Sequence, residues 1–307
     1  MVICGFFVST TGVQPTARQE ALRPGSGHGF PGICCWLAVC ALVVFGEECR
    51  IFRDRDLDCY VLADLGDMLS RSYYVLGRYY EDFVPLLIQR LLKPGDTFVD
   101  VGANRGVHTM FAARYLRGGR VVSFEPNPQT FRVLQAHVTM NDLANVEVHN
   151  MGVSDEEGVL HLQSFESDMP SGCSFIDKGY GPVKETFPVP VRRLEDVFGG
   201  EPLQGRTLIK VDTEGFDHRV IRGMGRLLES PQLIIATEVV DDWLRRSGSS
   251  AKELFDDMVG RGFEAFLPVV AFRGLKQVLS LRRITQIPDR EDQYDLVFAR
   301  PGIVSGD

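Results

Sequence analysis

The sequence predicts an α/β fold in which a mostly parallel sheet carries helices on both faces. Two observations support this prediction. Short apolar runs, typical of buried strands, alternate with longer segments that repeat their apolar residues at helical spacing. The alternation begins near residue 97 and continues, with one interruption, to residue 300. Strands separated by helices form right-handed βαβ units, which place successive strands parallel in one sheet.

The predicted strands are short apolar runs bounded by polar or turn-forming residues. In chain order they are residues 97–101 (TFVDV), 120–125 (RVVSFE), 145–150 (NVEVHN), 208–212 (LIKVD), 232–239 (QLIIATEV), 263–269 (FEAFLPV) and 294–300 (YDLVFAR). Together they predict a doubly wound, seven-stranded sheet. We expect the last two strands to form its antiparallel edge.

Capping residues mark where the predicted helices begin. Asn127 is a good N-cap, and Pro128 follows it at the first helical position, where proline is tolerated. Ser250 and Glu253 form a capping box at the start of another helix. With the apolar spacing, these signals predict helices at residues 82–92, 107–116, 127–141 and 250–261.

Composition narrows the class of protein. The chain of 307 residues is 44% hydrophobic and 24% charged, which is an ordinary globular balance. Its formal net charge is −8 and it contains no long run of Lys and Arg, so a nucleic-acid partner is not expected. Five of the seven cysteines fall within the first 49 residues, which argues against a disulfide framework in the remainder. No Cys-x-x-Cys pair or Cys/His cluster suggests a metal site, and we expect a cytoplasmic protein.

The first 46 residues form a leader that differs from the rest of the chain. Residues 30–46 (FPGICCWLAVCALVVFG) are apolar and uncharged, but the run is shorter than the ~20 residues that a membrane-spanning helix needs. A signal peptide, a membrane anchor, a poorly ordered extension and an over-long start of the reading frame all remain open. A membrane-anchored or exported protein is therefore the alternative to a cytoplasmic one.

Residues 47–302 are predicted to form a single domain, since no linker, repeat or low-complexity tract divides them. Residues 47–92 form a lead-in, with short strands expected from 47 to 75. Residues 155–206 interrupt the alternation with an insertion rich in Gly, Ser and Pro, which includes MPSGCSF, DKGYGPV and a strand-like FPVPVRRL.

The turn after the first predicted strand, in TFVDVGANRGVHT, carries the features of a ligand site. In a doubly wound sheet, ligands bind at the carboxyl ends of the strands. Gly102 permits a tight turn that brings the backbone close to a ligand, and Gly106 leaves space where the helix meets the strand. The start of the helix favours an anion, while Asp100 favours an ammonium group. A ligand with both groups is an amino acid.

Glu125 closes the second predicted strand, 23 residues after Gly102. An acid at this position can accept hydrogen bonds from both hydroxyls of a ribose. An amino acid joined to a ribose indicates S-adenosylmethionine (SAM). NAD is the main competitor, but its pyrophosphate favours G-x-G-x-x-G, and Asn104 replaces the middle glycine of that pattern. A glycine turn that binds no ligand is the other alternative.

Three ordered motifs, DTFVDVGANRGVHTMFAAR, SFEPNPQTFRVL and IKVDTEGFDHRVIRGM, resemble the FkbM-type SAM-dependent methyltransferases. The resemblance runs from about Tyr79 to Arg300 and is loose in the insertion. It implies a class I methyltransferase (Rossmann-like) fold with the last strand antiparallel, and methyl transfer to a hydroxyl of a small molecule, sugar or glycan. It also implies which residues contact SAM: Asp100, Gly102, Ala103, Asn104 and Gly106 at the methionine end, Glu125 at the ribose, and Asn150 to Gly152 at the adenine.

Methyl transfer to an alcohol is helped by a base that removes the hydroxyl proton. Asp212 and Glu214 end the fourth predicted strand beside the cofactor site, and Glu238 ends the fifth. Structural roles are the alternatives: Asp212 could order its loop, Glu214 could cap a helix, and Glu238 could pair with Arg245. His218 is expected to be a packing or surface residue. We therefore predict SAM-dependent O-methylation, with N-methylation or a non-catalytic SAM-binding module of the same fold as alternatives.

Overall fold

The computed structural model describes residues 49–79, 83–165, 173–179, 181–274, 276–288 and 293–304. The expectations for the leader, residues 1–46, concern a part of the chain outside these ranges. Within the ranges, no helix combines the length and the apolar composition that crossing a membrane requires.

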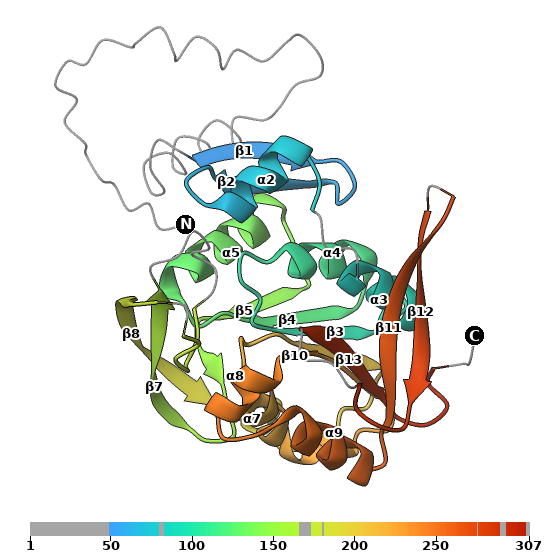
Figure 1. The fold of residues 1–307 in the computed structure, drawn as a ribbon. Coiled ribbons are helices and arrows are strands. Elements are labelled where there is room, and N and C mark those ends of the chain that lie inside the picture. Colours follow the sequence, from blue (N-terminus) through green and yellow to red (C-terminus); the bar gives the residue numbers. More distant parts are fainter. Residues whose placement is uncertain are drawn as a thin grey trace, which may run out of the picture.

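A sheet of eight strands forms the centre of the molecule, in the order β12-β11-β13-β10-β9-β3-β4-β5 (Figure 1). The strands are β3 (Thr97–Val101), β4 (Arg120–Phe124), β5 (Val146–His149), β9 (Thr207–Val211), β10 (Leu233–Val239), β11 (Glu264–Arg273), β12 (Lys276–Ile284) and β13 (Tyr294–Ala299). From β10 to β5 they run parallel, while β13 pairs antiparallel with β10 and β11. The predicted α/β fold with an antiparallel edge is confirmed. The expected count of seven strands is too low, because β12 pairs with β11.

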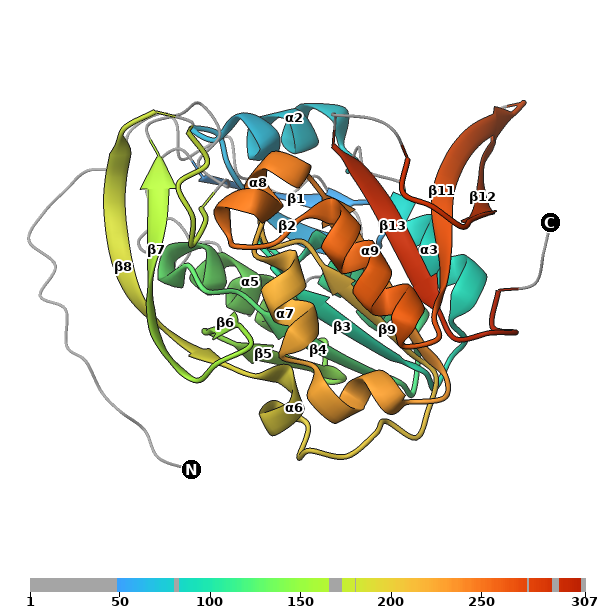
Figure 2. The same cartoon turned by 60° about the horizontal axis from the view of Figure 1, so that its bottom comes forward.

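Helices cover both faces of this sheet (Figures 1 and 2). One face carries α3 (Phe83–Leu91), α4 (Val107–Tyr115) and α5 (Pro128–Met140), and the other carries α7 (Asp217–Arg222) and α9 (Ala251–Gly260). Shorter helices are α6 (Leu194–Val197), η2 (Gly225–Glu229) and α8 (Asp241–Arg246). The side chains of Asn127 and Ser250 cap α5 and α9 as predicted, each accepting a hydrogen bond from a backbone N–H.

The central strands are buried on both faces, which explains their uninterrupted apolar sequences. Successive residues of a strand point to opposite faces. Phe98 of β3 therefore packs into the core beneath α3 and α4, while Val99 packs into the core beneath α7 and α9, and both are fully buried. This arrangement leaves the carboxyl ends of the strands as the place where polar side chains gather.

The first part of the lead-in, residues 49–76, packs against α5 and forms a further layer beyond the helices of the first face (Figure 1). It consists of an antiparallel hairpin, β1 (Cys49–Asp54) and β2 (Cys59–Asp64), followed by α2 (Met68–Leu76). Residues 68–76 are therefore helical, whereas strands were expected there. Two side chains at the end of α5 bond to β2: His137 Nε2 accepts from the N–H of Leu62 at 2.7 Å, and Asn141 bonds to both backbone groups of Tyr60.

The insertion and the short strand just before it form a small sheet in the order β6-β8-β7, beside the main sheet (Figures 1 and 2). Its strands are β6 (Gly152–Val153), β7 (Gly158–Phe165) and β8 (Val183–Arg192). The strand-like FPVPVRRL falls largely within β8. Between β7 and β8, residues 173–178 return to the carboxyl ends of the main sheet, and we name this segment the strap.

Candidate active site

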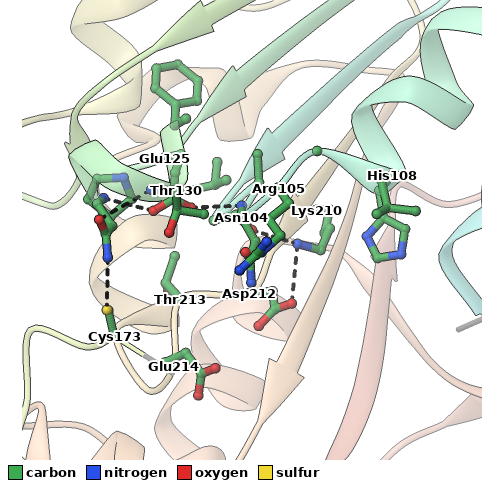
Figure 3. A pocket seen from close by; sticks show the side chains of 18 of the residues that line it. Asn104, Arg105, His108, Glu125, Thr130, Cys173, Lys210, Asp212, Thr213 and Glu214 are labelled. Carbon is green, nitrogen blue, oxygen red and sulfur yellow. Dashed lines mark hydrogen bonds and ion pairs between the residues drawn. The ribbon is translucent and has the colours of Figure 1, made fainter. Parts of the chain in front are cut away.

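A cavity of about 640 Å³ opens at the carboxyl ends of the parallel strands. Its walls come from the turns after β3, β4 and β9, from the end of β10, from the strap and from the lead-in. Asn104, Glu125 and Asp212 project from the three turns (Figure 3). Both the volume and the position are typical of ligand sites in doubly wound sheets.

The glycine turn, residues 102–106, fits tightly between neighbouring elements. Gly102 has φ +78°, and a Cβ on it would overlap the carbonyl oxygen of Asp212. Gly106 has φ +82°, and a Cβ there would overlap the side chain of Leu134 on α5. Both positions therefore require glycine. The residues of the turn that line the cavity are Gly102, Ala103, Asn104, Arg105 and Gly106.

Glu125 lies beside the glycine turn with both carboxylate oxygens held in place. Oε2 accepts a hydrogen bond from the backbone N–H of Asn104, and Oε1 accepts one from that of Asn127, each at 2.8 Å. Burial raises the pKa of Glu125 to about 7, although these two hydrogen bonds act in the opposite direction. Each oxygen retains a further lone pair, so this carboxylate can accept two hydroxyls of one ligand.

Asp100 lies beneath the floor of the cavity and does not line it. Its side chain is fully buried and accepts a hydrogen bond from Thr109 Oγ1 at 2.7 Å. The other carboxylate oxygen is 3.2 Å from Lys210 Nζ on the neighbouring strand β9. The structure thus places Asp100 behind Lys210, whose side chain lines the cavity.

Lys210 links three parts of the site, and the sequence-based prediction omits it. Besides Asp100, its Nζ contacts the carbonyl oxygen of Gly102 at 3.1 Å and Asp212 Oδ2 at 3.3 Å (Figure 3). Burial acts to lower the pKa of Lys210, but the carboxylates of Asp100 and Asp212 outweigh it and raise the pKa. The sequence does contain a signal for the role of Lys210. It is a lysine within the apolar run LIKVD, and a charge in a buried strand requires a partner.

Of the two residues predicted to border the adenine, Gly152 lines the cavity and Asn150 supports the cavity wall from behind. Gly152 lines the cavity at the start of β6, together with Met151. Asn150 does not line it: its Nδ2 donates to the carbonyl oxygens of Glu125 and Pro126, at 2.9 and 3.2 Å. Asn150 therefore fixes the turn after β4.

Asp212 and Glu214 both line the cavity from the turn after β9. The side chain of Asp212 is 40% exposed, and Lys210 holds one of its oxygens. Glu214 has φ +56°, and its carboxylate is 2.6 Å from the Nζ of Lys178 in the strap. Burial raises the pKa of Glu214, and Lys178 opposes this shift. Each acid pairs with a lysine through one oxygen, and the two differ in exposure, since the side chain of Asp212 is 40% exposed and that of Glu214 is 29% exposed.

Glu238 reaches the cavity from the end of β10 and accepts a hydrogen bond from Gln293. Burial raises the pKa of Glu238 to about 10, and repulsion from neighbouring acids, chiefly Asp212, adds to the shift. The alternative pairing with Arg245 is not formed, because Arg245 lies 2.6 Å from Asp241. Both causes favour the protonated form of Glu238.

Asp217, which the sequence-based prediction also omits, organises the turn after β9. It is buried and accepts hydrogen bonds from the backbone N–H groups of Thr213, at 3.2 Å, and Gly215, at 3.0 Å. Burial raises the pKa of Asp217 to about 7. The neighbouring His218 does not line the cavity and contacts Asp257 on α9, as expected for a packing residue.

The lead-in supplies a cavity wall, residues 61–63, that no motif indicated. His137 joins this wall to the glycine turn. Its Nε2 accepts from the N–H of Leu62, so Nδ1 carries the proton and donates to the carbonyl oxygen of Arg105 at 2.6 Å. Burial lowers the pKa of His137 to about 4, which keeps the ring neutral. Arg105 also pairs with Asp67 at the start of α2, at 3.2 Å.

Three buried polar atoms in the cavity wall have no hydrogen-bond partner within the part of the chain that the structure describes. They are Asn104 Oδ1, Thr213 Oγ1 and Asp67 Oδ1. Such atoms are rare in folded proteins and indicate a ligand or water that completes their hydrogen bonds. Together with the spare lone pairs of Glu125, they suit a ligand that carries hydroxyl and amino groups.

Residues 100–264, just over half of the chain, match the sequence model of the methyltransferase FkbM domain. The chain belongs to the FkbM methyltransferase family. Methyltransferase 1 of Beauveria bassiana (strain ARSEF 2860) is 32% identical over 149 residues, which cover 43% of this chain and 59% of that protein. The 31-O-demethyl-FK506 methyltransferase FkbM of Streptomyces tacrolimicus is 28% identical over 159 residues, covering 43% of this chain and 61% of that protein. This chain thus spans about three fifths of the length of these two curated relatives.

Solved structures of methyltransferases also align with this FkbM-family chain. The methyltransferase FkbM of Methylobacillus flagellatus aligns over 66% of this chain and 43% of its own, with 15% identity and a TM-score of 0.39. The SAM-dependent O-methyltransferase of Thermotoga maritima aligns over 84% of this chain and 80% of its own, with 13% identity and a TM-score of 0.40.

The FkbM domain match includes the glycine turn, Glu125, the turn after β9 and Glu238. The parallel sheet with antiparallel β13 beside β10 is the class I methyltransferase arrangement that the sequence predicts. The match begins at Asp100, so the lead-in lies outside it, as does Gln293. Two walls of the cavity therefore lie outside the residues that the family model matches.

Proposed function

We propose that this FkbM-family protein uses SAM to methylate a hydroxyl group of a small molecule, sugar or glycan. The observation that carries the proposal is the position of Glu125, whose carboxylate is fixed by two backbone N–H groups beside the glycine turn and keeps the capacity to accept a ribose diol. The family match supports methyl transfer. The name of the S. tacrolimicus relative, which specifies a 31-O-demethyl substrate, supports an oxygen acceptor.

The residues of the cavity fit SAM at each of its parts. The glycine turn leads into α4, whose first N–H groups favour the carboxylate of a methionine end. The unsatisfied Asn104 Oδ1 suits an amino group, Glu125 suits the ribose, and Gly152 borders the space for adenine. NAD fits less well, because Asn104 replaces a glycine that favours a pyrophosphate. When bound, SAM supplies a methyl group that its sulfonium activates for displacement.

Asp212 is the residue that we propose as the general base. Its side chain is more exposed than that of Glu214, and Lys210 holds one carboxylate oxygen while the other remains available. A base at this place would take the proton of the acceptor hydroxyl, which typically contributes ~10²–10⁴-fold to a rate. Glu214 is assigned a positioning role instead, since its ion pair with Lys178 joins the strap to the turn after β9.

Glu238 and Gln293 are proposed to orient the acceptor. A protonated Glu238 can donate a hydrogen bond to an acceptor oxygen, while Gln293 holds its other oxygen. Holding the hydroxyl in line with the reacting bond is the larger part of catalysis for an already activated donor. The cavity walls that lie outside the FkbM match, from the lead-in and Gln293, are the places where acceptor selectivity would be set.

Incubation of the full chain with methyl-labelled SAM and a panel of alcohols, sugars and amines tests this proposal. We expect label on oxygen, and loss of transfer by ~10²-fold or more in Asp212→Asn. The matched control is Asp256→Asn, which changes an exposed aspartate on α9. Label on nitrogen alone would support the N-methyltransferase alternative. SAM binding without transfer to any acceptor would support a non-catalytic binding module.

A further inference from the structure

An ion pair between the glycine turn and the lead-in forms part of the cavity wall. Arg105 Nη2 of the turn is 3.2 Å from Asp67 Oδ2 at the start of α2, and both residues line the cavity. Arg105 lies next to Asn104 there (Figure 3). The side chain of Asp67 is 2% exposed and that of Arg105 is 22% exposed. Charged groups with so little contact with water need a full set of hydrogen-bond partners.

Each member of this pair keeps the capacity to bind a ligand. Asp67 Oδ2 accepts a hydrogen bond from the N–H of Ser70 at 3.0 Å, whereas Oδ1 has no partner among the residues that the structure describes. The guanidinium of Arg105 carries several N–H donors, and its described contact is with Asp67 alone. The pair therefore presents an anionic acceptor and cationic donors side by side.

The lead-in holds the pair in place. Asp67 is the N-cap residue of α2, which fixes its carboxylate. The carbonyl oxygen of Arg105 accepts a hydrogen bond from His137 Nδ1, and His137 in turn accepts one from the N–H of Leu62 on β2. The glycine turn is thus tied to the lead-in at two points. Groups that are positioned before a ligand arrives lose little freedom when it binds.

The charged pair beneath the glycine turn is less suited to a ligand. Lys210 contacts Asp100, Asp212 and the carbonyl oxygen of Gly102, all within the protein. Asp100 is fully buried behind Lys210. The turn also leads into α4, whose first N–H groups attract an anion. An anionic group at this place therefore meets both the start of α4 and the guanidinium of Arg105.

We propose that Arg105 and Asp67 bind the amino-acid end of SAM, so that the lead-in takes part in cofactor recognition. This inference rests on the proposed function. The ligand carboxylate accepts hydrogen bonds from Arg105, and the ligand ammonium group donates to Asp67 Oδ1 and Asn104 Oδ1. Opposite charges then adjoin one another around the whole pair. Asp67 lies outside the residues that the family model matches, so this part of the site is a feature of the lead-in.

A calorimetric titration of the full chain with three ligands at neutral pH tests this inference without an acceptor. S-adenosylhomocysteine (SAH), which remains when SAM has lost its methyl group, carries both charged groups of the amino acid. Aminopropylthioadenosine keeps the amino group and lacks the carboxylate, and methylthioadenosine lacks both. We expect the wild-type protein to bind SAH about 10- to 100-fold more tightly than aminopropylthioadenosine, because a hydrogen bond to a charged group is lost.

Two variants separate the members of the pair. Arg105→Met keeps an apolar stem and removes the donors, so its preference for SAH over aminopropylthioadenosine should fall to about threefold or less. Asp67→Asn keeps an oxygen to cap α2 and removes the charge. Its affinity for the two ligands with an amino group should fall about tenfold, while that for methylthioadenosine stays within about twofold. Arg117→Met and Asp56→Asn change exposed residues and should retain the wild-type affinities.

Methylthioadenosine measures whether the rest of the site is intact, since it presents only the adenosine part. If the wild-type protein binds SAH no more tightly than aminopropylthioadenosine, the inference is overturned, whether or not the variants fold. A wild-type preference retained in Arg105→Met would also overturn it, as would equal losses for all three ligands in the conservative variant Asp67→Asn. If neither SAH nor methylthioadenosine binds the wild-type protein, the proposed function itself fails.

Discussion

The backbone N–H of Asn104 donates a 2.8 Å hydrogen bond to Glu125 Oε2, so the turn after β3 and the acid after β4 form one unit. The N–H of Asn127 holds the other oxygen, which fixes the plane of the carboxylate. An acid oriented in this way loses little side-chain freedom when it binds a diol. This unit is the basis of the proposed cofactor site.

The substitution Glu125→Gln tests that unit. A glutamine presents one oxygen and one NH₂ group, so its amide faces one of the two backbone N–H groups without accepting a hydrogen bond. We expect the affinities for SAM and SAH, which share the ribose, to fall together by about 10- to 100-fold in calorimetry. Glu185→Gln, on the exposed part of β8, is the matched control. Unchanged SAM affinity in Glu125→Gln would remove the ribose assignment.

Gly102→Ala tests the contact between the glycine turn and the turn after β9. The new Cβ would overlap the carbonyl oxygen of Asp212 at a φ of +78°. We expect a lower melting temperature and a loss of SAM binding of at least about tenfold, because the two turns must separate. Gly205→Ala is the control, since a Cβ there meets open space. Wild-type binding in Gly102→Ala would show that the two turns need not touch in the binding-competent state.

The buried pair of Asp100 and Lys210 gives a prediction for stability. Lys210→Met leaves the Asp100 carboxylate without its cation, and such a loss typically costs about 3–5 kcal/mol of the free energy of unfolding. The double variant Asp100→Asn/Lys210→Met should recover a large part of that loss. Urea unfolding of the two single variants and the double variant measures the coupling. Strictly additive effects would mean that the pair does not interact as described.

The pH dependence of stability provides a test of Glu238 that needs no ligand. Its pKa is raised from 4.5 to about 10 by folding, so the folded protein holds a proton between these values that the unfolded chain has released. Glu238 therefore makes its full contribution to the free energy of unfolding below pH 4.5, and this contribution is lost as the pH rises toward 10. Relative to wild type, Glu238→Gln should gain stability between pH 5 and 9, by at most about 1.4 kcal/mol per pH unit. A stability difference that does not vary with pH would show that Glu238 titrates normally.

Much of the fold was predictable because the central strands are buried on both faces and read as apolar runs. Thr97–Val101 forms a strand as predicted, and the capping role of Asn127 is confirmed. β12 was not predictable in the same way, since KQVLSLRRI mixes charges with apolar residues at an edge. α2 was also missed, although Asp67 at its N-cap is the same kind of helix-start signal as Asn127.

The candidate site was predictable where one segment determines the geometry, and not where two segments meet. The glycine turn and Glu125 follow from local sequence and from spacing along the chain. The role of Asp100 depends on strand order, because Lys210 becomes its register partner only when β9 lies beside β3. The engagement of Glu214 likewise depends on Lys178, which reaches it from the strap 36 residues earlier in the chain. Contacts of this kind are set by tertiary packing rather than by local pattern.

A crystal structure of the full chain grown with SAM is the most direct test of the central claim. We predict both ribose hydroxyls within hydrogen-bond distance of Glu125, and the methionine end along the glycine turn, residues 102–106. Electron density for SAM at any other place, or a ribose turned away from Glu125, would contradict the proposed site.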